Sequence, residues 1–257
     1  PRRGLAIGRR VALGLFDKCY RFTRAREVQA AGYYPYFMPI EASYDTEVVI
    51  HGQRKVMVGS NNYLGLTHHP KVLAAAEAAL KRYGSGCTGS RFLNGTLDLH
   101  EQLEERLARF LGQEAALVFS TGYQTNLGVI ATLVGRDDYL FLDKLNHASI
   151  VDGGRLSYGT VYRYPHGDLD TLERMLASAP PDAGKLIVTD GIFSMEGDIV
   201  DLPRVVALAE FYGAEVMVDD AHAFGVLGER GGGTAQHFHL EDKVSLIMAT
   251  FSKSLAS

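Results

Sequence analysis

Short apolar runs alternate with segments of helical periodicity from about residue 70 to the end of the chain. Short runs rich in Val, Ile and Leu indicate strands that are buried on both faces, and intervening helices are typical of a parallel sheet. We therefore predict an α/β domain with a mainly parallel sheet flanked by helices. The apolar runs are ALVF, YLFL, TVYRY, KLIVTD, EVMVDD and SLIMAT, and the expected helices are 71–83, 97–111, 124–134, 147–157, 168–178 and 202–212.

The N-terminal part of the chain has a different pattern. Residues 1–30 contain many basic and few acidic residues, with apolar residues at roughly helical spacing, so we expect a basic amphipathic helix. The segment EVVIHGQRKVMV then predicts two short β segments around a polar turn. Residues 1–59 would thus form a small subdomain, and residues 60–257 the large α/β domain. The basic residues are Arg2, Arg3, Arg9, Arg10, Lys18, Arg21, Arg24 and Arg26.

The basic segment has two interpretations. In the first, its polar face is solvated and its other side packs on the body of the protein or on a partner subunit. In the second, the segment is attracted to a membrane surface, as a peripheral contact, or to acyl-CoA. The sequence leaves both interpretations open.

Composition and charge exclude several classes of protein. The formal net charge of −4 gives no basic field for nucleic acid, and no apolar run approaches the ~20 residues that span a bilayer. Cys19 and Cys87 lack CxxC spacing and no histidines pair at i, i+4, so neither a disulfide framework nor a metal site is expected. A cytoplasmic setting fits. Because the chain lacks an initiator Met and stops at Ser257, we expect the large domain to be incomplete at its C-terminus.

A glycine-rich segment, Gly84–Gly89, matches the G-x-G-x-x-G pattern of dinucleotide-binding folds. That pattern needs a strand before it and a helix directly after it. Here a helix is expected before the segment, and the string SRFLNG follows it. We interpret the segment as a tight loop that approaches a ligand or a neighbouring subunit.

A phosphate-binding turn is expected at Ser120–Asn126, which follows the run ALVF and opens a helix. A helix N-terminus offers unpaired N–H groups and the positive end of the helix dipole. Thr121 adds a hydroxyl group, and Gly122 permits close approach of a ligand. The alternative role for Thr121 is that of a simple N-cap.

Two further strand ends carry groups suited to catalysis. Asp219, Asp220 and His222 follow an apolar run, and acidic groups after a buried strand need a cationic partner, for which a protonated pyridine nitrogen would serve. Lys253 follows the run SLIMA and becomes a nucleophilic amine if burial lowers its pKa. Thr250 and Ser252 beside it could bind phosphate oxygens.

Two more segments follow strands of the same predicted sheet. His147 in NHASI can lie flat against an aromatic ring, and Ser194 in DGIFSMEGD can point into the same pocket. Ligands of parallel sheets bind at the carboxyl ends of the strands, so all these groups are expected to converge.

In this order, the motifs STGYQTN, NHASIVDG, DGIFSMEGD, VDDAH and TFSKS resemble those of the α-oxoamine synthases, a family of fold-type I pyridoxal 5'-phosphate (PLP) enzymes. The resemblance runs from about Gly32 to the end of the chain. It implies the fold-type I transferase fold, PLP as the cofactor and a homodimer. It also implies that the C-terminal domain, with an arginine that binds the amino-acid carboxylate, lies beyond residue 257.

The resemblance further implies roles for single residues. Lys253 would bind PLP as a Schiff base, Asp219 would pair with the pyridinium nitrogen, and His147 would stack on the ring. His222 and Ser194 would bond the ring hydroxyl group. The catalytic set would be Lys253, His147, Asp219 and His222, and the phosphate would be surrounded by Thr121, Gly122, Tyr123, Thr250 and Ser252.

Within the family, the strings GYYPYF, SNNYLGLTHHP and GSGCTGSRFLNGTLDLH are most similar to bacterial members that condense L-serine with a long-chain acyl-CoA. The resemblance therefore implies an acyltransferase that converts L-serine and palmitoyl-CoA to 3-ketodihydrosphingosine, CoA and CO2, the first step of sphingolipid synthesis. Asn61 would approach the substrate. The first alternative is a family member with a different amino acid or acyl-CoA. The others are an aminotransferase and a regulatory subunit that has lost the cofactor.

Overall fold

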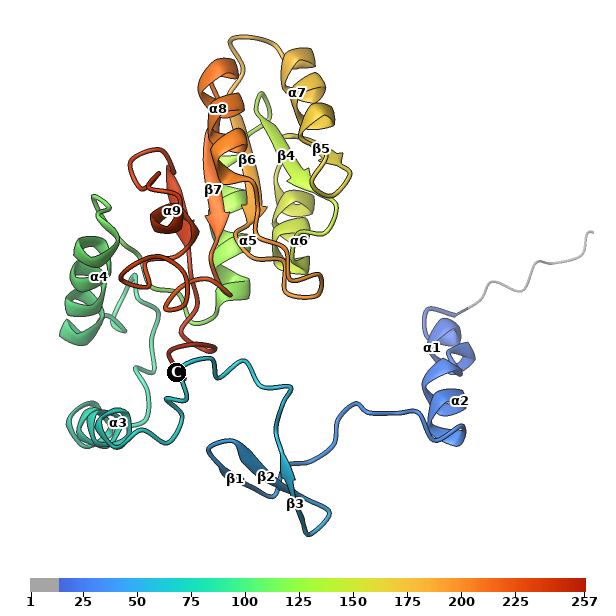
Figure 1. Cartoon of the computed structure of the whole chain (residues 1–257), viewed down its shortest axis with the longest axis vertical. Coiled ribbons are helices and arrows are strands. Elements are labelled where there is room, and N and C mark those ends of the chain that lie inside the picture. Colours follow the sequence, from blue (N-terminus) through green and yellow to red (C-terminus); the bar gives the residue numbers. More distant parts are fainter. Residues whose placement is uncertain (1–13) are drawn as a thin grey trace, which may run out of the picture. The chain divides into compact units, whose positions relative to one another are not determined.

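The computed structural model describes residues 14–257, which divide into two compact units at Val56–Met57 (Figure 1). The boundary expected from the sequence lies slightly later, between residues 59 and 60. The first unit holds a three-stranded sheet and the second holds a five-stranded sheet.

The sheet of the first unit is antiparallel and consists of β1 (Ala42–Tyr44), β2 (Glu47–Ile50) and β3 (Gln53–Val56), in that order. β2 and β3 are joined by His51 and Gly52, which have φ values of 52° and 71°. Positive φ at both central residues is typical of the type I′ turn, whose twist matches that of a hairpin. The two β segments expected in EVVIHGQRKVMV are therefore present, whereas β1 was not expected.

The expected basic helix differs in the part that the structure describes. Residues 14–30 form two short helices, α1 (Asp17–Arg21) and α2 (Arg24–Ala30), because the backbone becomes extended at Phe22. Neither helix buries a residue. Short helices have marginal stability unless tertiary packing supports them. Since no residue of α1 or α2 is buried, no packing is seen that would stabilise one continuous helix. The basic residues outside the described part are Arg2, Arg3, Arg9 and Arg10.

The second unit is built on a parallel sheet in the order β5-β4-β6-β7-β8. All neighbouring pairs are parallel, so the carboxyl ends of the strands lie at one edge of the sheet. The predicted mainly parallel sheet is confirmed. Its strands are β4 (Tyr139–Asp143), β5 (Thr160–Tyr164), β6 (Lys185–Asp190), β7 (Glu215–Asp219) and β8 (Leu246–Met248).

All the expected helices of the second unit are present. The short α9 (Thr234–His237) is an addition that the sequence did not suggest. The expected helices are α3 (Pro70–Tyr83), α4 (Asp98–Leu111), α5 (Gly122–Leu133), α6 (Ala148–Leu156), α7 (Leu169–Ser178) and α8 (Leu202–Tyr212).

Helices cover both faces of the parallel sheet (Figure 1). On one face, Phe141 and Ile187 pack with residues of α7 and α8, and on the other, Leu142 and Val188 pack with residues of α5 and α6. Neighbouring residues of a strand point to opposite faces, so a strand covered on both sides needs apolar residues throughout. Each fully buried Val, Leu, Ile or Phe side chain contributes about 1.5–3 kcal/mol.

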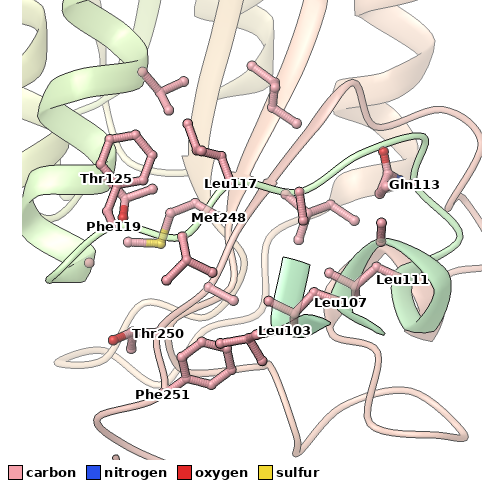
Figure 2. A pocket seen from close by; sticks show the side chains of 18 of the residues that line it. Leu103, Leu107, Leu111, Gln113, Leu117, Phe119, Thr125, Met248, Thr250 and Phe251 are labelled. Atoms are coloured by element: carbon pink, nitrogen blue, oxygen red, sulfur yellow. The ribbon is translucent and has the colours of Figure 1, made fainter. Parts of the chain in front are cut away.

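One expected strand is missing. The apolar run ALVF (116–119) pairs with no strand among residues 14–257, and β8 has only β7 as a neighbour. Both segments instead line a cavity of about 670 Å³, in which Leu117 and Met248 lie with leucines of α4 (Figure 2). A strand forms only where a neighbouring backbone supplies hydrogen bonds, and the described residues place none beside ALVF. The run's apolar character was predicted correctly, but its pairing was not.

Candidate active site

Two buried carboxylates lie side by side at the ends of the central strands. Asp190 ends β6, Asp219 ends β7, and the two residues are partners in the sheet register. Burial, followed by the charge of Asp219, raises the pKa of Asp190 to about 8. Within residues 14–257 neither carboxylate forms a salt bridge. The pair therefore favours a cationic ligand, because a buried negative charge is costly without a partner.

Asp219 is held on both carboxylate oxygens. Its Oδ2 accepts a hydrogen bond from Nδ2 of Asn126 at 2.7 Å, and its Oδ1 accepts one from the backbone N–H of Ala221 at 3.0 Å. Asn126 is fully buried on α5, and its Nδ2 also donates to Oγ of Ser149 at 2.9 Å. The carboxylate is thus fixed in orientation before any ligand binds.

Lys253 lies in the segment that follows β8, and its side chain reaches His222, three residues beyond the end of β7. Its Nζ lies 3.0 Å from Nε2 of His222. Burial lowers the pKa of Lys253, although the charges of Asp219 and Asp190 oppose this. Burial and the charge of Lys253 also lower the pKa of His222. The site therefore favours a neutral imidazole and makes the amine of Lys253 less basic. A less basic amine is more easily deprotonated, and the deprotonated amine is the form in which a lysine acts as a nucleophile.

The expected phosphate-binding turn meets the segment that carries Lys253. Thr121 is the N-cap of α5, with its Oγ1 accepting a hydrogen bond from the N–H of Gln124 at 3.1 Å. A Cβ added to Gly122 would lie 3.3 Å from Cβ of Thr250. Oγ of Ser252 lies 3.0 Å from Oγ1 of Thr250. A helix N-terminus and these hydroxyl groups thus gather beside the lysine, as an anion site requires.

His147 and Tyr123 complete the group around the carboxylates. The backbone N–H of His147 donates to Oδ2 of Asp190 at 3.0 Å, and its Nδ1 lies 2.7 Å from Oγ of Ser149. The ring of Tyr123 stands edge-on to the imidazole with centroids 6.4 Å apart, and its hydroxyl group donates to Asp152. These contacts fix the imidazole at the start of α6.

Two residues singled out from the sequence lie differently. Ser194 occupies an exposed turn after β6 and forms no hydrogen bond to the other candidate residues of the described chain. Asn61 lies outside the sheet, where its Oδ1 accepts a hydrogen bond from the hydroxyl group of Tyr63 at 3.1 Å. Asn61 therefore reaches the site through Tyr63, whose hydroxyl oxygen lies 2.7 Å from Nδ1 of His222.

Sequence reasoning missed Tyr63 and Asn126, which contact His222 and Asp219. For Asn126 a signal existed, because it shares one face of α5 with the apolar Val129 and Ile130 and so occupies a buried polar position. For Tyr63 no comparable signal existed. An exposed tyrosine after two asparagines has no periodicity that relates it to a distant histidine.

The residues of this site fit PLP. The cofactor carries an aldehyde that reacts with an amine, a ring nitrogen that is cationic when protonated, and a phosphate group. The described chain offers a lysine of lowered pKa, a buried carboxylate pair without a salt bridge, and a helix N-terminus bordered by hydroxyl groups. Each group of the cofactor therefore has a chemically matched partner.

Two structural findings bear on other classes of site. Among residues 14–257, no helix combines the length and the apolar character needed to cross a bilayer. In the same part of the chain, no cluster of three or more His, Cys, Asp or Glu side chains is arranged to hold a metal ion.

The family model for aminotransferase class I and II matches residues 53–257 of the chain. A serine palmitoyltransferase from Sphingobacterium spiritivorum is 56% identical over 243 residues, which are 95% of this chain and 61% of that protein. An 8-amino-7-oxononanoate synthase from Geobacter sulfurreducens is 50% identical over 230 residues, or 90% of this chain and 59% of that protein. The chain spans about three fifths of the length of these curated relatives.

Solved structures agree with these relatives. A Sphingomonas wittichii serine palmitoyltransferase is 41% identical, with a TM-score of 0.91 over 95% of this chain and 62% of that chain. A high-resolution structure of SPT with PLP is 39% identical, with a TM-score of 0.90 over 94% of this chain and 61% of that chain. The predicted fold-type I transferase fold is confirmed, and so is PLP as the cofactor.

Proposed function

The chain belongs to the aminotransferase class I and II family, as an α-oxoamine synthase, and on this premise we propose that it condenses L-serine with palmitoyl-CoA. The products are 3-ketodihydrosphingosine, CoA and CO2. The reaction breaks the bond between the α-carbon and the carboxylate of serine, and the carbon–sulfur bond of the thioester. It forms one bond, between the α-carbon of serine and the carbonyl carbon of the acyl group.

The contact between Lys253 and His222 beside the buried carboxylates carries this proposal. A lysine 3.0 Å from a neutral imidazole, with a lowered pKa, is prepared to attack an aldehyde or to remove a proton. A lysine with only a structural role would be expected to pair with a carboxylate or to lie in solvent. The serine palmitoyltransferase among the relatives supports the choice of substrates.

The candidate residues would hold PLP in three places. Asp219 would face the ring nitrogen, His147 would lie against the ring, and Lys253 would hold the aldehyde carbon. His222 and Ser194 would bond the ring hydroxyl group, for which Ser194 must turn inward from its exposed position. The phosphate would be bound by Thr121, Gly122, Tyr123, Thr250 and Ser252. When bound, PLP supplies an electron sink for negative charge that develops on the α-carbon of the amino acid.

The chain's own groups would perform the proton transfer and the positioning. The amine of Lys253 would take the α-proton, because burial lowers its pKa and so makes the neutral amine more accessible. Hydrogen bonds from Asn126 and from the N–H of Ala221 hold the carboxyl group of Asp219 in orientation. The imidazole of His147 polarises the thioester carbonyl, and Asn61 contacts the substrate. Orientation of the reacting bond is the protein's main contribution.

A second candidate function is supported by the similarity to 8-amino-7-oxononanoate synthase, which is 50% identical to this chain. In this case the site residues and their chemistry stay the same, but another amino acid and another acyl thioester are joined. Pocket residues outside the core of the site decide between them, since specificity for a side chain or chain length is set by the walls of the pocket.

A turnover panel tests the proposal. The protein is incubated with L-serine, L-alanine or glycine, each with palmitoyl-CoA or a short acyl-CoA, and release of CoA and CO2 is measured. We expect L-serine with palmitoyl-CoA to give the highest kcat/KM. Preference for L-alanine with a shorter acyl thioester would favour the second candidate. Exchange of amino and keto acids without CoA release would contradict both and indicate an aminotransferase.

We also propose that the protein is a homodimer, as the family resemblance implies, and that it works in the cytoplasm, as its cysteine pattern suggests. Its partners would then be the two substrates and a second copy of the chain. The glycine loop 84–95 is a candidate for reaching across to the second subunit. Light scattering of the purified protein tests the dimer, and a mass of one chain would contradict it.

A further inference from the structure

A chain of three hydrogen bonds links the site lysine to a segment outside the sheet. It runs from Nζ of Lys253 to Nε2 of His222 at 3.0 Å, and from Nδ1 of His222 to the hydroxyl oxygen of Tyr63 at 2.7 Å. The hydroxyl group of Tyr63 then donates to Oδ1 of Asn61 at 3.1 Å. Both nitrogens of the imidazole are therefore occupied.

The chemistry of these groups fixes the direction of each hydrogen bond. Oδ1 of Asn61 can only accept, so the single hydroxyl hydrogen of Tyr63 is used there. The Tyr63 oxygen can then offer only a lone pair, and Nδ1 of His222 must carry the hydrogen. A neutral imidazole has one N–H, so Nε2 presents its lone pair to Lys253. Burial raises the pKa of Tyr63. Burial and the charge of Lys253 lower the pKa of His222. Both shifts favour the neutral form, of the tyrosine and of the imidazole.

The tautomer of His222 decides what the amine of Lys253 can do. If Nε2 accepts, the amine donates one N–H to it and its own lone pair stays free to attack a carbonyl carbon. If Nε2 carried the hydrogen, it would donate to that lone pair and block the nucleophile. The direction of the hydrogen bond between Tyr63 and Asn61 thus controls the reactivity of Lys253 through His222.

We propose that Tyr63, oriented by Asn61, is a positioning residue that holds His222 in the Nδ1-protonated tautomer and so keeps the lone pair of Lys253 free. The inference rests on the proposed role of Lys253 as the attacking amine. Within residues 14–257 the hydroxyl group of Tyr63 has hydrogen-bond partners in Asn61 and His222 and none in Lys253, so it would act through the imidazole.

Chemical modification of Lys253 in the cofactor-free protein tests this. Acetylation by acetic anhydride is followed by peptide mass spectrometry from pH 6 to pH 11, which gives the rate for the neutral amine at the upper plateau. We expect Tyr63→Phe to lower this plateau about threefold to tenfold, the size of one neutral hydrogen bond. Tyr158→Phe is the matched control, because Tyr158 is 71% exposed and lies against Arg136 instead.

A second variant separates orientation from packing. Asn61→Leu keeps the ring of Tyr63 but removes its acceptor, so the hydroxyl group can turn and donate to Nδ1 of His222. We expect the same lowered plateau, and ¹⁵N chemical shifts of His222 that change from the Nδ1-protonated to the Nε2-protonated tautomer.

The proposal is overturned by a wild-type His222 that is protonated on Nε2. A plateau that stays unchanged in Tyr63→Phe also overturns it, and so does one that falls in Tyr63→Phe but not in Asn61→Leu. None of these measurements uses PLP, serine or acyl-CoA. A protein that fails the turnover panel can therefore still pass this test, and the reverse also holds.

Discussion

Asp190 and Asp219 lie next to each other in the sheet. Burial and the charge of Asp219 make ionisation of Asp190 unfavourable in the folded state, so ionisation reduces the stability of the fold. A carboxyl group whose pKa is raised to about 8 holds its proton in the folded state at pH values where the unfolded chain has lost it. Its favourable contribution is therefore present below the unfolded pKa of about 4 and is lost as pH rises to about 8. The cofactor-free protein should lose stability over that window.

Substitution of Asp190 by Asn tests this. Asn keeps an oxygen acceptor for the N–H of His147 but removes the charge next to Asp219. We expect the variant to be more stable than the wild type at pH 9 and equally stable at pH 4. At pH 9, a gain of about 1 kcal/mol would raise Tm by about 2–4 °C in a chain of this size. Thermal unfolding without PLP measures it, with the exposed Asp182→Asn as control, and an unchanged Tm at pH 9 would refute the cost assigned to the pair.

At the scale of elements, a histidine joins the turn after β6 to the end of β4. Nδ1 of His166 lies 3.0 Å from Asp143, Nε2 lies 3.2 Å from Asp198, and the ring stands edge-on to Phe193. Both nitrogens can donate only in the imidazolium. Burial alone lowers the pKa of His166, but the two carboxylates outweigh it and the net pKa is raised. The bridge thus tethers the turn that carries Ser194.

This tether should depend on pH. A histidine with a raised pKa contributes stability that is complete below its unfolded pKa of about 6.5 and is lost as pH rises through the folded value. We expect amide hydrogen exchange in residues 191–199, corrected for its intrinsic pH dependence, to accelerate several-fold as the imidazolium loses its proton. His166→Asn should exchange fast at every pH. Equal pH dependence in the variant would show that another group controls the turn.

The same turn begins at a glycine that packing makes necessary. A Cβ on Gly191 would lie 2.1 Å from Oδ1 of Asp220 and 2.2 Å from Oγ1 of Thr234. These two side chains are buried and hydrogen-bonded to each other at 2.6 Å, so neither can move away freely. Gly191→Ala should therefore cost about 1–3 kcal/mol, the usual range for overpacking.

Urea unfolding of Gly191→Ala beside Gly59→Ala measures this cost. A Cβ on Gly59 would meet no atom within 4 Å, and its backbone lies outside the left-handed region. We expect the control to match the wild type within about 0.5 kcal/mol. A Gly191 variant as stable as the control would mean that the side chains of Asp220 and Thr234 can shift to make room for the Cβ at little cost in free energy.

At the scale of the whole molecule, local pattern predicted the elements well and long-range pairing poorly. The helix expected at 202–212 is observed with those bounds, because apolar spacing and the cap of Asp201 are local signals. The run ALVF failed as a strand because pairing depends on a backbone segment far away in the sequence. β1 was missed for the same reason, since its pairing with β2 is not encoded in its own three residues.

The candidate site divides in the same way. Lys253, Asp219 and His222 were predicted because strand ends of a parallel sheet meet at one edge, which topology alone ensures. Asn126 and Tyr63 were not, because they act on those residues across 93 and 159 positions of sequence. Side chains that orient other side chains leave no pattern of their own in a single sequence.

The central claim is that Lys253 is the residue that binds PLP covalently. The most direct measurement is reduction of the PLP-loaded protein with borohydride, followed by peptide mass spectrometry. We predict that the cofactor mass is found on the peptide containing Lys253, and that Lys253→Ala carries none while it still folds. Label on another lysine, such as Lys144 or Lys243, or no label on the wild type, would contradict the account.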